Sequence, residues 1–175
     1  MSSFEQTIDD RDLQDALQLL EARGTNLRPA LLGIGEAWIG LVKASFATST
    51  SPFGDKWAPN AAATYSAHLA RFSGSYSKKT GKLTATGGRR VLNKKPLIGE
   101  TRALSTQIYK QVDGNTLTIG SPMAYAAIHQ FGGNAGKGKK VSIPSRKFMP
   151  IDDTGGLAPK ARDIALVELE DYLKP

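Results

Sequence analysis

The residues whose types and spacing could best support catalysis or ligand binding lie between Tyr125 and Met149, in the stretch YAAIHQFGGNAGKGKKVSIPSRKFM. Its histidine could serve as a general base, and its segment GGNAGKGKK could form a phosphate-binding loop. A Walker loop has four residues between its first glycine and the Gly-Lys pair, and Ser or Thr follows. Here three residues separate Gly132 from Gly136-Lys137, and Gly138 follows. The spacing therefore excludes a Walker loop and favours a flexible, lysine-bearing hinge.

His129 lacks the companions that histidine catalysis requires. The sequence has no Asp or Glu between Asp113 and Asp152 to orient the imidazole locally, and it contains neither G-x-S-x-G nor HExxH. We therefore predict no catalytic residue and no enzyme activity. We interpret His129 as a structural imidazole that hydrogen-bonds a backbone carbonyl, and we expect His68, on a polar helix, to be exposed.

Composition limits the classes of protein further. The chain has no cysteine and 2 histidines, so a zinc site would have to rely on carboxylates, and we expect neither a metal nor a cofactor. Its 175 residues are 40% hydrophobic and 22% charged, which is sufficient for one domain with its own core. We assign residues 1–175 to a single domain.

No signal peptide or membrane span is predicted. The N-terminal residues MSSFEQTIDD lack a basic region followed by an apolar one. The most apolar run, from Pro29 to Val42, is interrupted by Glu36 and is judged too short to cross a bilayer. We expect a protein made in the cytosol that has no membrane partner.

Charge is distributed unevenly along the chain. The net charge is +7 and the pI is about 9.7. Residues 5–21 hold six acids and one arginine, whereas residues 71–95 hold eight basic residues and no acid. This asymmetry favours a nucleic-acid partner, or a subunit whose acidic end faces the basic middle of a neighbour. A solvated basic loop would explain the same pattern.

The first half of the chain reads as helices joined by a loop. Asp9 or Asp10 could cap a first helix, with Gly24 at its C-terminal end. A second helix is predicted over 27–48, although three interior glycines weaken it and indicate close packing against another segment. Residues 49–59 form a loop with Phe53 and Trp57 as anchors, and a third helix covers 60–72. The polar, lysine-rich segment 73–95 is expected to be mobile.

The second half carries strand signals. Alternation over 106–112 and 116–121, around Asp113-Gly114-Asn115, predicts a β-hairpin. A short helix over 124–131 should end at Gly132-Gly133, the lysine-rich segment 133–140 should be mobile, and 141–143 could form a strand. A final helix is predicted over 158–173. The fold class is therefore α+β, with N-terminal and C-terminal helices around a mainly antiparallel sheet.

Four motifs in order carry a family resemblance: SPFGDKWAP, LIGETRALSTQI, TLTIGSPMAYAAIHQFGG and IPSRKFMPI. From about Leu31 to its C-terminus the chain resembles the phage virion morphogenesis (tail-completion) proteins of Mu-like and other tailed bacteriophages. It departs from the family's common pattern before Leu104, where Thr-Gly is usual, and at Lys147, where proline is frequent. The first departure implies a differently built turn, and neither touches a reaction centre.

The resemblance implies a structural virion component rather than an enzyme, with a tail-terminator or tail-completion type of fold. Such a protein would lie at the neck or tail end of the virion and be assembled in the host cytoplasm. It would form a ring with copies of itself, most simply of six, and contact the tail tube protein and the head–tail connector proteins. DNA passing through such a ring would be met without sequence specificity.

Two groups of residues are predicted to build the assembly surface. The interface candidates are Phe53, Trp57, Tyr125, Phe131, Ile143, Arg146 and Phe148. The stretch from Tyr125 to Met149 is called the motif below, and the residues expected to shape it are His129, Gly132 and Gly133.

Two alternatives remain open at this stage. The first is a head–tail connector (stopper) subunit, which belongs to the same structural class. The second is a basic nucleic-acid-binding module, although segment 71–95 offers only Phe72 and Tyr76 as stacking aromatics and shows no helix-turn-helix or RNA-recognition signature. An enzyme that uses His129 would be a third class, with no indicated substrate.

Overall fold

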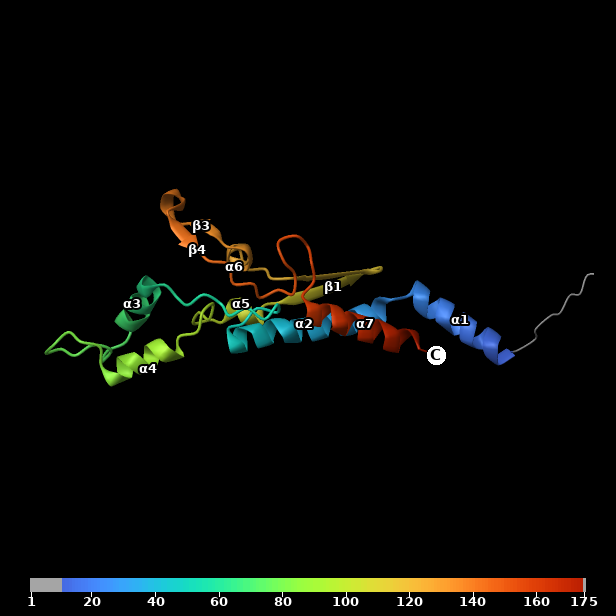
Figure 1. Cartoon of the computed structure of the whole chain (residues 1–175), viewed down its shortest axis with the longest axis horizontal. Coiled ribbons are helices and arrows are strands. Elements are labelled where there is room, and N and C mark those ends of the chain that lie inside the picture. The colour runs from blue at the N-terminus through green and yellow to red at the C-terminus, as the bar shows by residue number, and fades with distance from the viewer. Residues whose placement is uncertain (1–10, 175) are drawn as a thin grey trace, which may run out of the picture.

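The computed structural model describes residues 11–174, and its central element is the long helix α2 (Figure 1). The elements in chain order are α1 (Arg11–Thr25), α2 (Arg28–Thr48), α3 (Ala62–Ala70), α4 (Ala85–Asn93), α5 (Ala103–Thr106), β1 (Tyr109–Asp113), β2 (Thr116–Gly120), α6 (Ala126–Phe131), β3 (Gly133–Ala135), η1 (Lys137–Lys139), β4 (Val141–Ile143) and α7 (Pro159–Leu173). The predicted α+β class is confirmed. The caps predicted at Asp9 or Asp10 lie outside the described residues, and Gly24 lies inside α1 instead of ending it.

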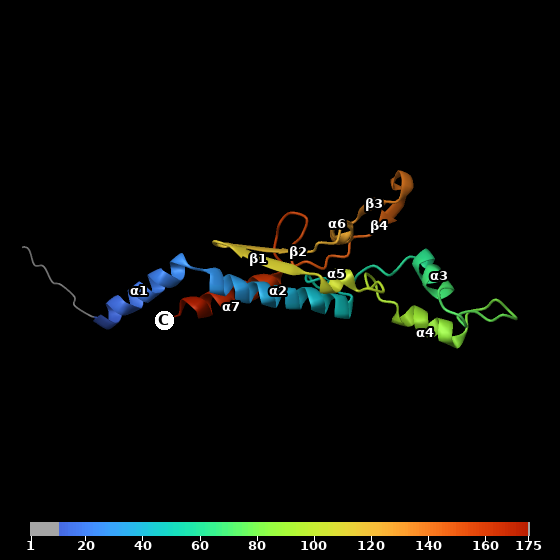
Figure 2. The same ribbon diagram turned by 180° about the vertical axis from the view of Figure 1, so that it is seen from behind.

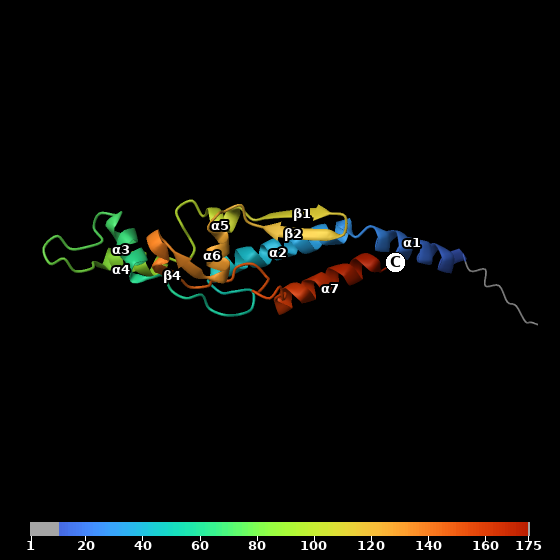
Figure 3. The same ribbon diagram turned by 90° about the horizontal axis from the view of Figure 1, so that it is seen from above.

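Helix α2 lies between the β1–β2 hairpin and α7, as Figure 3 shows from above. Two of its glycines make this close packing possible. A Cβ atom on Gly35 would lie 2.9 Å from Lys110 Cδ of the hairpin, and one on Gly33 would lie 2.8 Å from Glu168 Oε2 of α7. Gly40 has nothing within 4 Å. The glycines predicted to weaken α2 thus include two that let neighbouring segments approach it.

Polar side chains attach both neighbours to α2. Lys110 Nζ donates to Leu32 O at 3.0 Å and to Glu36 Oε2 at 2.7 Å. Arg28 Nη1 donates to Val112 O at 2.8 Å. On the other side, Trp38 Nε1 donates to the carbonyl of Ala161 in α7 at 2.9 Å. The bonds to Val112 O and Ala161 O satisfy part-buried backbone carbonyls, and together the four bonds connect α2 to both of its neighbours.

The main hydrophobic cluster lies around the C-terminal half of α2. Val42 and Phe46 of α2 pack there with residues from three other segments, namely Trp57, Leu104, Phe148 and Met149. The ring of Phe46 meets Trp57 edge-on, with centroids 5.3 Å apart, and meets Phe148 at 5.4 Å. Aromatic pairs at these separations add to the stabilisation from burial alone. The loop 49–59 is therefore anchored to α2 by Trp57, as predicted.

The length of α2 corrects one expectation. Its 21 residues, with a mean hydropathy of 1.4, make it the one helix of the described chain that is long and apolar enough to cross a membrane. The shorter run from Pro29 to Val42 was judged too short for this. However, Ile34, Ile39, Val42 and Phe46 are buried in the protein itself, and core helices commonly pass the same test of length and composition.

Helices α3 and α4 form a small module at one end of the molecule (Figures 1 and 2). Segment 73–95, which was predicted to be mobile and was assigned no helix or strand, contains α4 and an antiparallel bridge between Tyr76 and Leu83. Thr84 caps α4 by accepting a hydrogen bond from Gly87 N at 3.0 Å, and the buried Ser75 Oγ donates to Leu69 O at 2.9 Å. The segment is folded by non-local contacts, while its mobility stays a prediction.

The strands form two separate two-stranded sheets. The hairpin β1–β2 is antiparallel with Val112 opposite Leu117, which confirms the predicted hairpin and turn. The predicted start of the first strand at 106 is wrong, because Thr106 ends helix α5 and β1 begins at Tyr109. The second sheet pairs β4, which was predicted, with β3, which was not, and Gly133 lies opposite Ile143. Antiparallel pairing was expected, but the expected single sheet is divided between the α2 body and the α6 region.

Candidate assembly surface

The segment from α6 to Met149 is organised around one buried amide, Gln130, which is 3% exposed. Its Oε1 accepts hydrogen bonds from Phe148 N and Met149 N, both at 2.9 Å. Its Nε2 donates to Ile151 O at 2.9 Å. One side chain therefore satisfies three backbone groups of the following segment, two of them in a fully buried setting. Sequence reasoning missed this residue.

Gly132 allows the chain to turn directly after α6. Its φ is +77°, in a region that favours glycine. A Cβ atom there would lie 2.9 Å from Ser145 N and 3.2 Å from Ile143 O, so any other residue would clash with the backbone of the returning segment. The prediction that Gly132 shapes the motif agrees with this geometry, and Gly133, with φ +142°, begins the β3–β4 pair.

The motif is joined to loop 49–59 through Arg146 and Trp57, and to α2 through Phe148, whose ring packs on Phe46. The guanidinium of Arg146 donates to Ala58 O at 2.8 Å and to Pro59 O at 2.7 Å. Trp57 Nε1 donates to Lys147 O at 2.9 Å. Burial lowers the pKa of Arg146 from its ordinary value, and the two carbonyls supply acceptors for its buried charge. These contacts join loop 49–59 to the motif.

The same three residues were predicted to contact neighbouring subunits. Trp57, Arg146 and Phe148 are 7%, 7% and 1% exposed within the single chain. Their burial gives them a role inside the subunit and leaves their side chains almost no surface to offer a neighbour. Phe53, within the loop 49–59, is half-buried, and Lys147 Nζ lies 5.8 Å from its ring centroid.

His129 does not make the hydrogen bond expected of it. Its Nδ1 is buried without a partner among the described residues, and its ring meets Tyr125 edge-on at 6.0 Å. Burial, and secondarily the positive charge of Arg146, lower the pKa of His129 from its ordinary value. The backbone carbonyl of His129 accepts a hydrogen bond from Arg146 N at 2.7 Å. The contact that joins His129 to the segment after β4 is therefore made by its backbone carbonyl, and its role in shaping the motif stays a prediction.

Three large apolar side chains of the motif are exposed, beside exposed polar residues such as Lys137 and Lys140. Tyr125, Phe131 and Val141 are 45%, 50% and 53% exposed. Tyr125 and Val141 line a cavity of about 540 Å³ together with the half-buried Ile143. Exposed aromatic side chains next to a cavity are typical of protein contact surfaces. Of the predicted interface residues, Tyr125, Phe131 and Ile143 retain surface for such a contact.

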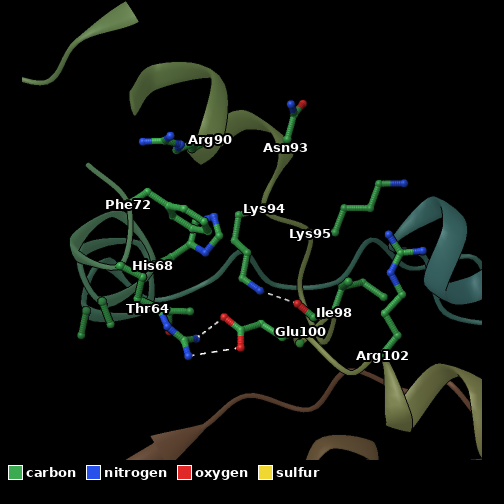
Figure 4. A pocket seen from close by; sticks show the side chains of 14 residues that line it. Thr64, His68, Phe72, Arg90, Asn93, Lys94, Lys95, Ile98, Glu100 and Arg102 are labelled. Carbon is green, nitrogen blue, oxygen red and sulfur yellow. Dashed lines mark hydrogen bonds and ion pairs between the residues drawn. The ribbon is translucent and has the colours of Figure 1, made fainter. Parts of the chain in front are cut away.

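A larger and more basic hollow lies between α3, α4 and residues 94–102. Its volume is about 1000 Å³, and Figure 4 shows the side chains that line it. Arg71 pairs with Glu100 at 2.6 Å, and Arg90 donates to Ser75 Oγ at 2.8 Å while lying over the ring of Phe72. His68 lines this hollow and is partly buried against Phe72.

Each hollow has one histidine in its lining, His68 in the larger and His129 in the smaller. Within residues 11–174 no cluster of three or more His, Asp or Glu side chains could hold a metal ion. His68 contacts an aromatic ring, and the Nδ1 of His129 is enclosed. The motif combines a buried glutamine that bonds three backbone groups with exposed apolar side chains. This arrangement is suited to contact with another protein.

Comparison with known proteins places the chain among phage proteins. Residues 8–170 match the phage virion morphogenesis family. Over 79 residues the chain is 38% identical to a protein of Haemophilus influenzae (strain ATCC 51907 / DSM 11121 / KW20 / Rd) described as Mu-like prophage FluMu G protein 2. That match covers 45% of this chain and 52% of the relative, so the chain spans about half the length of that protein. No solved structure matches the chain significantly.

Proposed function

Because the chain belongs to the phage virion morphogenesis family, we propose that it completes the phage tail: copies form a ring that closes the tail tube and joins it to the head. Membership of this family indicates a role in building the virion. The position at the neck or tail end, the ring, and the contacts with tail tube and connector proteins are the proposed part.

The observation that carries the proposal is the set of large apolar side chains that the motif between Tyr125 and Met149 leaves exposed. Tyr125, Phe131 and Val141 are each about half exposed, while Gln130 beneath them is held by three hydrogen bonds. The part of this surface that Gln130 anchors loses little conformational freedom when it binds, whereas segment 133–140 is the part proposed to become ordered. Assembly proteins benefit from such surfaces because each subunit must contact neighbours in one fixed orientation.

A nucleic-acid-binding module is less well supported, because several cations of segment 71–95 are engaged within the subunit. Lys95 Nζ donates to Ala47 O at 2.6 Å, Lys94 Nζ donates to Ile98 O, and Arg71 pairs with Glu100. A salt-sensitive gel shift by the purified protein would favour that alternative.

The decisive experiment removes the gene from an inducible phage or prophage and examines the lysate by electron microscopy. We expect separate filled heads and unjoined tails, and we expect plasmid-borne wild-type protein to restore whole particles. Light scattering and negative staining of the purified protein should show a ring. Normal particles without the gene would overturn the proposal, and so would accumulation of unfilled heads with no tail defect.

Within this proposal, segments 73–95 and 133–140 become more ordered when neighbours cover them, as polar segments commonly do on binding. Limited proteolysis of free and assembled protein measures the difference. Equal resistance in both forms would contradict ordering on assembly, without bearing on the ring itself.

A further inference from the structure

The cavity beside the motif, which we call the motif cavity, is lined by cations and by no acid. Its volume is about 540 Å³, and it lies between the start of α3, residues 94–104, α6 and β4. The cationic side chains in its lining are Lys94, Lys95 and Arg146, and no aspartate or glutamate of the described chain lines it. Figure 4 shows the two lysines from the larger hollow, which they also line. The motif cavity therefore carries positive charge without a matching negative charge.

The acids that lie nearest along the chain do not supply this negative charge. Glu100 is flanked by two lining residues, but its carboxylate pairs with Arg71 at 2.6 Å and lines the larger hollow instead. The chain has no acid between Asp113 and Asp152, so α6 and β4 contribute none to the cavity. The excess of positive charge thus extends to every segment that forms the cavity.

Arg146 is the most deeply buried of the three cations, at 7% exposed. Its Nε and Nη2 donate to the carbonyls of Ala58 and Pro59, and its Nη1 has no hydrogen-bond partner among residues 11–174. The two carbonyls orient the guanidinium but have no net charge to balance it. Burial lowers the pKa of Arg146, and the group that opposes this effect is Tyr65, not a carboxylate. A buried cation without a counter-ion in its own subunit favours binding of an anion.

Apolar side chains form another part of the same lining. Tyr125 and Val141 are 45% and 53% exposed, and Leu97 and Ile143 are half-buried. Ligand sites in proteins are commonly cavities of about 300–1,000 Å³ in which apolar groups surround a few fixed polar ones. The motif cavity has this composition. It is suited to a ligand that carries a carboxylate next to hydrocarbon.

We propose that the motif cavity binds an acidic segment of another virion protein. A glutamate or aspartate carboxylate of that segment would pair with Arg146, and an adjacent apolar side chain would cover Tyr125 and Val141. Hydrogen bonds from arginine to a carboxylate are about twice as strong as neutral ones. That the partner is a virion protein rests on the proposed function, whereas carboxylate binding by the cavity does not.

Two observations favour a protein segment over other anions. The exposed apolar surface continues outside the cavity at Phe131, which is 50% exposed, so an extended chain would gain contacts that a small carboxylate would not. A nucleic-acid backbone would bring no apolar group to Tyr125 and Val141. The nearly buried guanidinium of Arg146 also offers little surface to a row of phosphates.

A matched pair of capped tripeptides tests the chemistry on the purified full-length protein. One peptide has the sequence Leu-Glu-Leu, and in the other glutamine replaces the glutamate. Binding is followed by NMR through the Nε–H resonance of Arg146. The glutamate peptide should shift this resonance and bind at least roughly tenfold more tightly than the glutamine peptide, because only its side chain is charged. Equal affinities would overturn the carboxylate site, and propionate binding as tightly as the glutamate peptide would overturn the protein partner.

Substitutions at the exposed Val141 test the location while Arg146, which also holds loop 49–59, stays intact. V141E places a carboxylate of the protein itself in the lining, so it should bind the glutamate peptide at least roughly tenfold more weakly than V141Q, which has a similar size and no charge. V167E makes the same change at an exposed position of α7 outside the lining and should bind as wild type does. Circular dichroism verifies that each variant is folded. Equal binding by V141E and V141Q would place the peptide elsewhere and refute the assignment.

Complementation of a phage that lacks the gene separates this inference from the proposed function. Plasmid-borne V141Q should restore whole particles, and V141E should not. If both restore particles, the cavity is not used in assembly, and the present inference is wrong while tail completion stands. If loss of the gene leaves particles normal, the proposed function is wrong, and the virion partner falls with it. Displacement of the glutamate peptide by a short oligothymidylate that binds more tightly would identify a nucleic-acid ligand and also overturn the protein partner.

Discussion

The most informative single change is Q130M, which preserves the length of the side chain but removes its hydrogen-bonding groups. Gln130 is 3% exposed and accepts from Phe148 N and Met149 N at 2.9 Å each. Methionine packs readily in apolar surroundings, so the substitution isolates the loss of polar partners from the creation of a cavity. The variant tests whether this amide organises the motif.

The expected cost follows from the two buried amides. Each backbone N–H left without a partner in a buried position costs about 1–3 kcal/mol, so the pair costs about 2–6 kcal/mol. The third partner, Ile151 O, belongs to a residue that is 38% exposed and can be hydrated, so it is left out of the sum. A domain is stable by about 5–15 kcal/mol, which makes the predicted loss a large share of the total.

Urea unfolding followed by circular dichroism measures this difference. The control is Q111M, because Gln111 lies in β1 with an exposed side chain and surface substitutions change stability by only about 0.5 kcal/mol. The midpoint for Q130M should fall with little change in the slope of unfolding free energy against urea. A stability within about 0.5 kcal/mol of wild type would show that the two amides find other partners, and the reasoning would then be refuted.

Further substitutions test neighbouring features of the motif. G132A should destabilise more than G74A, because both glycines have positive φ but only Gly132 faces backbone atoms within 3 Å, and strained backbone alone costs about 1–3 kcal/mol; equal midpoints in urea would contradict this. F148A should cost about 3–5 kcal/mol, whereas F131A, at an exposed position, should cost about 0.5 kcal/mol, as thermal unfolding can establish. Burial lowers the pKa of His129 from 6.5, so the unfolded state binds more protons and stability should fall as pH drops below about 6.5. Replacement H129Q should reduce that slope in melts between pH 5 and 8, and an unchanged slope would exclude His129 as its source.

Elements with strong local signals were predictable from the sequence. The hairpin follows from alternation around a turn that contains Gly114, and α2 and α7 follow from their helical apolar spacing. Helix α4 was missed because TATGGRRVLN is rich in glycine, and its formation depends on the Thr84 cap and on contacts with Ser75. Strand β3 was missed for a similar reason, since its three residues form a strand only by pairing with β4.

The candidate site was predictable in location but not in the role of each residue. The motif could be found from its letters, yet nothing in them separates the buried Trp57 and Phe148 from the exposed Tyr125 and Phe131. That division depends on how loop 49–59 and the segment that contains Phe148 and Met149 pack on α2. Gln130 gave no signal either, because a glutamine within a helix is ordinarily solvated and only the fold encloses it.

The construction of α2 also determines the distance between the two ends of the subunit. A helix of 21 residues has a length of about 32 Å, at a rise of 1.5 Å per residue. Lys110 of β1 and Ala161 of α7 are hydrogen-bonded to it from two sides. Adding or removing one helical turn would displace the ends by about 5.4 Å. In the proposed self-assembly, each copy would then meet its neighbours with its contact surfaces out of position.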